Sequence, residues 1–252
     1  MSNSPSPHPA RLLVDPPAPG DWNMAVDEML LDRAADNAVD HGICLRFYEW
    51  SEATVSLGYF QSYAERESHT ASRTCPLVRR LSGGGAIVHD RELTYSLIVP
   101  AAHPLARRAP QLYARVHTTL IATLHALGFT ASLHGANDAA EPFLCFLRRT
   151  EADVVVGGAK IAGSAQRRRR GVILQHGSIV LDTSPAAPEL PGIAALTGHR
   201  LSADELRHAW LPQLACGLGI ECQPSPLAAA ERAQAENYRR QRFAADAWNR
   251  RK

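Results

Sequence analysis

A cysteine and a lysine form the most reactive pair of side chains that this sequence offers. Cys145 lies in the segment Glu141-Pro-Phe-Leu-Cys-Phe146, and Lys160 follows fifteen positions later. A free thiol has a pKa of about 8.5 and is mostly protonated at neutral pH, whereas a nearby ammonium favours the thiolate. If the fold brings the two together, the pair can form a thioester and stabilise the charge that develops on its carbonyl oxygen. The ordinary alternatives are a buried structural thiol and a solvent-exposed lysine.

A run of three glycines indicates a second part of the same site. It lies in Arg79-Arg-Leu-Ser-Gly-Gly-Gly-Ala-Ile-Val-His89-Asp90, with two arginines before the glycines and a histidine after them. Consecutive glycines cost conformational entropy and suit a backbone that approaches a ligand closely or presents bare N–H groups. The alternative is a wide glycine turn between strands. The segment matches neither a Walker loop nor a dinucleotide fingerprint.

Two further segments combine strand-like sequence with small residues or a histidine. In Val156-Gly-Gly-Ala-Lys160-Ile-Ala-Gly-Ser-Ala-Gln166, a hairpin turn at the glycine pair 157–158 would place Lys160 at the start of the returning strand. The small residues at 162–165 would leave room beside the lysine. In Leu174-Gln-His176-Gly-Ser-Ile the histidine lies on a strand, where a lone histidine more often has a structural role.

These segments, in this order and spacing, resemble the lipoate-protein ligase A family of cofactor transferases. The match consists of Arg-Arg-x-x-Gly-Gly-Gly-Ala-x-x-His-Asp, Gly-x-Lys-Ile-x-Gly-Ser-Ala-Gln and Gln-His-Gly-Ser, and Asn23-Met-Ala-Val-Asp-Glu28 is similar to the family's opening helix. The resemblance extends from about residue 11 to residue 185. It implies the catalytic-domain fold of the biotin and lipoyl protein ligases, with a mixed sheet around an acyl-binding tunnel, and work on lipoyl domains.

The family contains several chemistries, and the residues around Cys145 bear on the choice. ATP-dependent ligases activate free lipoate and generally lack a cysteine at this place. The octanoyltransferase branch has an Ala-Cys-Phe-like segment, which this sequence matches except for Leu144. A related amidotransferase branch tends toward a Ser-Phe-Cys-Pro-like segment, from which Phe146 departs. The resemblance therefore favours the octanoyltransferase branch. A ligase, an octanoyl amidotransferase between lipoyl domains, and a noncatalytic acyl- or carrier-binding protein are the alternatives.

Resemblance to the octanoyltransferase branch also implies partners and roles. The donor would be octanoyl-acyl carrier protein, and the acceptor would be a lysine of a lipoyl domain such as the glycine-cleavage H protein. Thioester exchange is nearly balanced, so no nucleotide, other cofactor or metal is expected. Cys145 would be the nucleophile and Lys160 its cationic partner. The residues expected to bind the substrate are Arg80, Gly83, Gly84, Gly85, His89, Gly163, Ser164, Ala165 and His176.

The apolar pattern of the chain predicts the helices and strands that must position these residues. Together they indicate a mixed α+β fold, a single domain whose mixed or antiparallel sheet is flanked by helices. Apolar spacing indicates helices after an N-cap at Asp21, over residues 111–127, and after the capping box Ser202-Ala-Asp-Glu205. A last helix is expected to open at Ser225-Pro226. Strands are expected at 44–47, 54–57, 92–100, 153–156 and 172–181, with a Gly- and Arg-rich connection between the last two.

Length and composition fit one soluble domain. The chain has 252 residues and a net charge of +2. It has no apolar run near the ~20 residues that a membrane helix needs, and its first residues lack the pattern of a signal peptide. We therefore expect a cytoplasmic chain without a membrane partner. A flexible tail is predicted over residues 1–10 and a catalytic domain over 11–252, with C-terminal helices from about residue 200.

Arginines are dense around the proposed site, at Arg148, at Arg149 and in the run Arg167 to Arg170. They either form a solvated loop or steer acidic carrier proteins toward the site. Nucleic acid is a poorer partner because aromatic residues are not interleaved with the run and the net charge is small. The five cysteines include no C-x-x-C pair, which argues against a disulfide framework and a zinc site.

Overall fold

The computed structural model describes residues 6–36, 42–139 and 142–251, and it centres on a large mixed sheet. The strand order in this sheet is β11-β1-β2-β6-β10-β9-β8-β7, and a smaller sheet has the order β4-β3-β5. In the large sheet, β1 pairs in parallel with β2 and with β11. The other neighbours of this sheet pair antiparallel, namely β2 with β6, β6 with β10, β10 with β9, β9 with β8 and β8 with β7. The bounds are β1 His8–Val14, β2 Ile43–Tyr48, β3 Thr54–Leu57, β4 Leu77–Arg79, β5 Ile87–His89, β6 Glu92–Val99, β7 Ala131–Leu133, β8 Val154–Val156, β9 Ala159–Arg169, β10 Val172–Val180 and β11 Ile220–Pro224.

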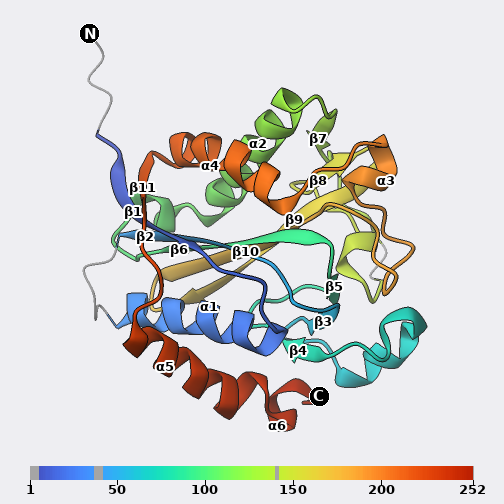
Figure 1. The fold of residues 1–252 in the computed structure, drawn as a ribbon, viewed down its shortest axis with the longest axis horizontal. Helices are drawn as coiled ribbons and strands as arrows, with labels where there is room; N and C mark the ends of the chain where they lie inside the picture. Colours follow the sequence, from blue (N-terminus) through green and yellow to red (C-terminus); the bar gives the residue numbers. More distant parts are fainter. Residues whose placement is uncertain (1–5, 37–41, 140–141, 252) are drawn as a thin grey trace.

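Helices cover both faces of the large sheet (Figure 1). One face packs against α2 (Ala109–Ala126) and α4 (Ala203–Leu218), and the other against α1 (Gly20–Ala35). Beyond α1 lie α5 (Ala229–Tyr238), a π-helical turn (Arg239–Phe243) and α6 (Asp246–Asn249), while α3 (Ile193–Thr197) follows β10 in the chain. Short 3₁₀ segments occupy Tyr63–Ser68, Thr70–Ser72, Pro104–Arg107 and Cys145–Leu147.

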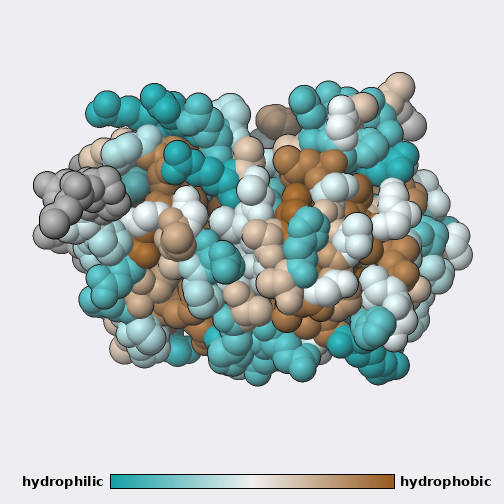
Figure 2. All heavy atoms as spheres, turned by 90° about the horizontal axis from the view of Figure 1, so that it is seen from above, coloured by the Kyte–Doolittle hydropathy of each residue, from teal (hydrophilic) through white to brown (hydrophobic). Residues whose placement is uncertain are grey.

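Alternation along the strands explains the two layers of the core. In β6, Leu93 and Leu97 pack with α2 and α4, whereas Ile98 packs on the α1 side. Figure 2 shows the molecule from the α2 and α4 side, where hydrophilic residues prevail at the rim and apolar patches show between them. No helix within the described residues has both the length and the apolar composition that crossing a membrane requires.

Several predicted helix boundaries need correction. The first helix begins at Gly20, so Asp21 lies in its first turn and is not its N-cap. The capping box of Ser202 and Glu205 is confirmed at the start of α4. The last helix begins at Ala229 and not at Ser225, because the Ser225 N–H still donates to the Leu12 carbonyl beside strand β11.

The N-terminal strand and the arginine run also differ from expectation. β1 begins at His8, inside the predicted tail, because its backbone pairs on both sides within the sheet. The Gly- and Arg-rich connection is not a loop, since β9 continues through Arg169 and pairs with β10 from Ala162 to Arg169. Arg170 and Gly171 then make a two-residue turn with φ of 46° and 85°, the left-handed conformation that tight hairpins need.

Candidate active site

A tight hairpin places Lys160 at the centre of the site. Gly157 and Gly158 join β8 to β9 with φ of 55° and 80°, as the sequence predicted for this turn. Lys160 follows on the returning strand, and its side chain is only 4% exposed. Its Nζ lies 2.8 Å from Oδ2 of Asp153, whose side chain is 2% exposed. The hairpin therefore brings a buried ammonium and a buried carboxylate into direct contact.

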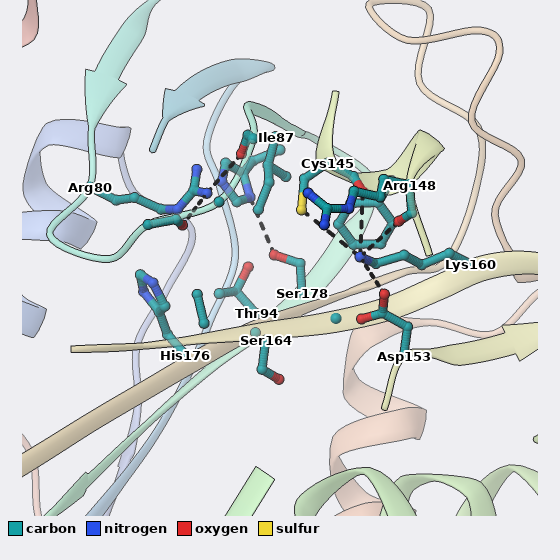
Figure 3. A pocket seen from close by; sticks show the side chains of 18 of the residues that line it. Arg80, Ile87, Thr94, Cys145, Arg148, Asp153, Lys160, Ser164, His176 and Ser178 are labelled. Carbon is teal, nitrogen blue, oxygen red and sulfur yellow. Dashed lines mark hydrogen bonds and ion pairs between the residues drawn. The ribbon is translucent and has the colours of Figure 1, made fainter. Parts of the chain in front are cut away.

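The 3₁₀ turn Cys145–Leu147 sets the Cys145 thiol beside this lysine. The Cys145 N–H donates to the Ala86 carbonyl at 2.7 Å, and the Ala86 N–H donates to the Phe143 carbonyl at 2.8 Å. These two bonds attach the cysteine segment to the residue that follows the glycine run. The Lys160 Nζ then lies 3.9 Å from the Cys145 Sγ, and Figure 3 shows Cys145, Lys160 and Asp153 gathered on one side of the cavity.

The lysine is held by several oxygen atoms as well as by the thiol. Its Nζ lies 3.4 Å from the Cys145 carbonyl and 3.3 Å from the Arg148 carbonyl, in addition to the Asp153 carboxylate. A unit charge pair at 3.9 Å interacts by about 4 kcal/mol at an effective dielectric constant of about 20. An ammonium in this position can stabilise the oxyanion that forms when a thioester is attacked.

Asp153 is a site residue that the sequence analysis placed only as the start of a strand. Its Oδ2 accepts from the Thr150 N–H at 2.6 Å and from the Thr150 hydroxyl at 3.0 Å. Tyr113 donates its hydroxyl to Oδ1 at 3.3 Å. A charged residue directly before the apolar run Val154–Val156 was the available signal, but its partner lies across the hairpin and becomes visible only in the fold.

The glycine run forms a loop that disfavours side chains at Gly84 and Gly85. Gly84 has a φ of +92°, and a Cβ added at Gly85 would lie 3.0 Å from the Phe143 carbonyl oxygen and 3.2 Å from the Cys145 nitrogen. Arg80 holds this loop by donating to the carbonyls of Gly83 and Gly85, each at 2.7 Å. Burial lowers the pKa of the Arg80 guanidinium to about 10, an effect that the nearby Cys145 partly opposes. The buried Arg80 guanidinium thus fixes the loop through hydrogen bonds to its carbonyl oxygens.

His89 is buried and bound on both ring nitrogens. Nε2 lies 2.7 Å from the Ser56 hydroxyl and Nδ1 lies 2.7 Å from the Glu92 carboxylate, while the ring stacks on Trp50. Burial lowers the pKa of His89, although Glu92 counteracts this. Its polar atoms are therefore engaged by the protein, and its face contributes to the cavity wall.

His176 connects the glycine loop to the opening helix α1. Its Nε2 lies 2.5 Å from the Ser82 hydroxyl and its Nδ1 lies 3.4 Å from Asp27. Burial raises the pKa of Asp27, but its hydrogen bond to His176 and the charge of Arg46 outweigh this and lower the pKa overall. These contacts fit the structural alternative for a strand histidine, and His176, which was predicted to bind substrate, also borders the cavity.

Strand β9 lines the cavity with small residues. A Cβ added at Gly163 would lie 2.7 Å from the Lys160 Cε, so only glycine leaves the lysine in place. Ala165 lies two positions on, and Figure 3 shows the Ser164 hydroxyl pointing away from the Cys145 thiol. That hydroxyl bonds to Tyr95 at 2.6 Å and to His117 Nε2 at 2.7 Å. Ser164 therefore lines the cavity mainly through its backbone.

One cavity of ≈ 710 Å³ unites the predicted site. It is bordered by every residue that the sequence analysis named as catalytic or substrate-binding, from Arg80 to His176. Apolar lining comes from Met24, Trp50 and Phe146, among others. A concave, partly apolar space with a few polar groups at one end suits a short acyl chain carrying a reactive carbonyl.

Comparison with known proteins gives this geometry a family. Residues 19–190, more than half of the chain, match the family described as "lipoyl protein ligase A/B catalytic domain". The chain belongs to this family. It is 33% identical to octanoyltransferase LipM of Geobacillus kaustophilus over 93% of this chain and 94% of that protein. It is 35% identical to octanoyltransferase LipM of Kyrpidia tusciae over 92% of this chain and 94% of that protein.

A solved structure confirms the fold independently. The bipartite lipoate protein ligase from Thermoplasma acidophilum, studied with its E2 lipoyl domain, superposes with a TM-score of 0.73 at 20% identity and covers 98% of both chains. The resemblance to the lipoate-protein ligase A family and the expected mixed α+β catalytic-domain fold are therefore confirmed.

Proposed function

We propose that this chain moves an octanoyl group from a thioester donor to a protein lysine through a covalent thioester on Cys145. Octanoyl transfer in lipoate biosynthesis, and hence acyltransferase activity, is supported by curated relatives that align over more than nine tenths of the chain. The observation that supports the cysteine route is the 3.9 Å separation of the Cys145 Sγ and the Lys160 Nζ inside the cavity.

The first half of the reaction exchanges one thioester for another. The Cys145 thiolate attacks the octanoyl carbonyl, the carbon–sulfur bond to the carrier breaks, and the carrier leaves as a thiol that takes up the proton given up by Cys145. The Lys160 ammonium faces the thiol and stabilises the oxyanion. No change in oxidation state and no nucleotide is needed.

The second half forms an amide and frees the cysteine. The neutral amine of the acceptor lysine attacks the carbonyl of the acyl-enzyme, the bond to the Cys145 sulfur breaks, and the cysteine regains a proton from the attacking amine. Asp153 keeps the Lys160 ammonium in place for both halves, because its carboxylate contacts Nζ at 2.8 Å. The glycine loop held by Arg80 walls the acyl chain.

We assign octanoyl-acyl carrier protein as the donor and a lipoyl domain, such as the glycine-cleavage H protein, as the acceptor, in the cytoplasm. The octanoyltransferase relatives support the octanoyl group as the group transferred, and the ligase of the same fold that was described together with its E2 lipoyl domain supports the class of acceptor. The cavity accepts the acyl chain and leaves the cysteine within reach of both carriers.

A transfer assay without ATP tests this function. Octanoyl-acyl carrier protein and an unmodified lipoyl domain are incubated with the enzyme, and octanoylation of the domain is followed by mass. The wild type and Cys216→Ala, which removes an exposed cysteine, should transfer the group at equal rates, and Cys145→Ala should not. Transfer that requires ATP and free octanoate, or an unchanged rate in Cys145→Ala, would overturn the proposal.

A further inference from the structure

The arginine run at the end of β9 and in the turn after it divides into paired and unpaired members. Arg169 pairs with Asp32 and Glu28 of α1, and Arg170 pairs with Asp36. These carboxylates largely neutralise the two charges. Arg167 has no ion pair within the described residues, and its buried Nε has no hydrogen-bond partner there. The run as a whole is therefore not a uniform positive surface, and Arg167 is its distinctive member.

The alternation of β9 places Arg167 on the cavity side. On one face, Ser164 bonds to His117, Gln166 donates to the Ala109 carbonyl and Arg168 donates to the Ala106 carbonyl, all in or next to α2. Gly163, Ala165 and Arg167 therefore share the opposite face, to which the Lys160 side chain also belongs. Arg167 is the first long side chain after the small residues along this face.

The guanidinium groups of Arg167 and Arg251 both contact the ring of Tyr59. Its Cζ lies 5.0 Å from the Tyr59 ring centre, and the Arg251 Cζ lies 4.0 Å from the same ring and 4.0 Å from the Trp248 ring. Arg251 also donates to the Tyr59 carbonyl at 2.9 Å and has no ion pair within the part of the chain that the structure describes. We call Tyr59, Phe60, Arg167, Trp248 and Arg251 the rim cluster.

The rim cluster is held by hydrogen bonds, and its member Phe60 lines the cavity. The buried Arg79 donates to the carbonyls of Gly58 and Gln61 on one side and to that of Asn249 on the other, which clamps the loop around Tyr59 to the C-terminal segment. Phe60 is 82% exposed and lines the same cavity as Cys145. Two preorganised guanidinium groups and an exposed ring thus stand at the edge of the space that contains the nucleophile.

We propose that the rim cluster binds the phosphodiester of the donor's phosphopantetheine arm. This inference rests on the proposed function, in which the acyl group arrives as a thioester on a carrier protein. Such an arm joins the thioester to a phosphodiester, and planar guanidinium groups bind phosphate oxygens through paired hydrogen bonds. With the thioester at Cys145, the arm leaves past Gly84 and Ala165, and its phosphate meets Arg167 and Arg251 while Phe60 packs on the apolar part of the arm.

Donors with and without a phosphate on the pantetheine arm test the proposal. The series is octanoyl-pantetheine, octanoyl-4′-phosphopantetheine and octanoyl-acyl carrier protein, each measured for acyl-enzyme formation. Arg167→Gln should lower kcat/KM for the two phosphorylated donors about 10- to 100-fold, mainly through KM, as expected for one charge-assisted hydrogen-bonding group. Octanoyl-pantetheine should react with the variant and the wild type at rates within about twofold of each other, because this donor has no phosphate for Arg167 to bind.

Arg170→Gln is the matched control, because this arginine of the same run faces Asp36. It should leave the whole donor series unchanged. An equal loss on all three donors in Arg167→Gln, or no loss on any, would overturn the inference while the proposed function stands. A wild type that forms no acyl-enzyme from any thioester would overturn both. If Arg167→Gln instead weakens the binding of ATP in an ATP-dependent reaction, the phosphate that Arg167 recognises belongs to a nucleotide, and the assignment to a carrier protein is wrong.

Discussion

Replacing Asp153 by asparagine removes the charge that holds Lys160 in place. The carboxylate lies 2.8 Å from Nζ, and both side chains are almost completely buried. An asparagine keeps the shape but offers one carbonyl oxygen where Oδ2 now receives the Thr150 N–H, the Thr150 hydroxyl and the ammonium. One partner of a buried ion pair is left without its counter-charge, a change that costs about 3–5 kcal/mol in the free energy of unfolding.

The catalytic consequence follows from the same geometry. The interaction of the ammonium with a thiolate at 3.9 Å is worth about 4 kcal/mol at an effective dielectric constant of about 20. If an unanchored lysine loses one third of this energy, acyl-enzyme formation slows about tenfold, since 1.36 kcal/mol is a factor of ten. We therefore expect Asp153→Asn to be less stable in urea unfolding and at least about tenfold slower in single-turnover acylation at pH 7.

A matched control separates this pair from an ordinary one. Asp138→Asn breaks the ion pair with Arg149 in the neighbouring segment, but that pair is partly exposed to solvent, so stability and acylation should change much less than in Asp153→Asn. Acylation is followed by intact mass in a quench-flow experiment, under conditions where each variant is folded. Wild-type stability together with wild-type acylation in Asp153→Asn would refute the argument that the carboxylate positions the lysine.

Two further predictions concern residues behind the site. Gly163→Ala places a Cβ 2.7 Å from the Lys160 Cε, so single-turnover acylation should fall at least about tenfold. The control Gly135→Ala, where nothing lies within 4 Å of the added Cβ, should acylate at the wild-type rate. Equal rates in the two variants would show that Gly163 does not constrain the lysine. Burial lowers the pKa of His117 to about 4, so below about pH 6.5 the unfolded chain binds a proton that the native chain does not, and stability falls as the pH falls from about 6.5 to 4 by up to about 3 kcal/mol. In urea unfolding, His117→Gln should lose this part of the pH dependence and the exposed His208→Gln should keep it; an unchanged slope in His117→Gln would contradict the account.

Local patterns predicted the parts of this protein that depend on near neighbours. The capping box at Ser202, the alternation of β6 and the glycine turn at 157–158 are each set by a few consecutive residues, and each is confirmed. The predicted catalytic and substrate-binding residues also border one cavity. These features could be predicted because sequence separation and spatial separation are both small, or because a family pattern supplies the arrangement.

Features that depend on distant pairing were missed. Strands β1 and β11 pair in parallel although about 200 residues separate them, and short strands such as Ile220–Pro224 carry little local signal of their own. Arg169 is a charged residue in an apparent loop until the fold brings Asp32 beside it. The role of Asp153 could not be predicted for the same reason, because its contact with Lys160 exists only once the hairpin has formed.

Intact-protein mass spectrometry of the acyl-enzyme tests the central claim most directly. The enzyme is mixed with octanoyl-acyl carrier protein in the absence of ATP and acceptor, and half of the sample is then treated with hydroxylamine. The account predicts one added octanoyl group that maps to Cys145, is removed by hydroxylamine, forms equally in Cys216→Ala and is absent from Cys145→Ala. An octanoyl group on another residue, or no adduct in a wild type that still modifies a lipoyl domain, would contradict it.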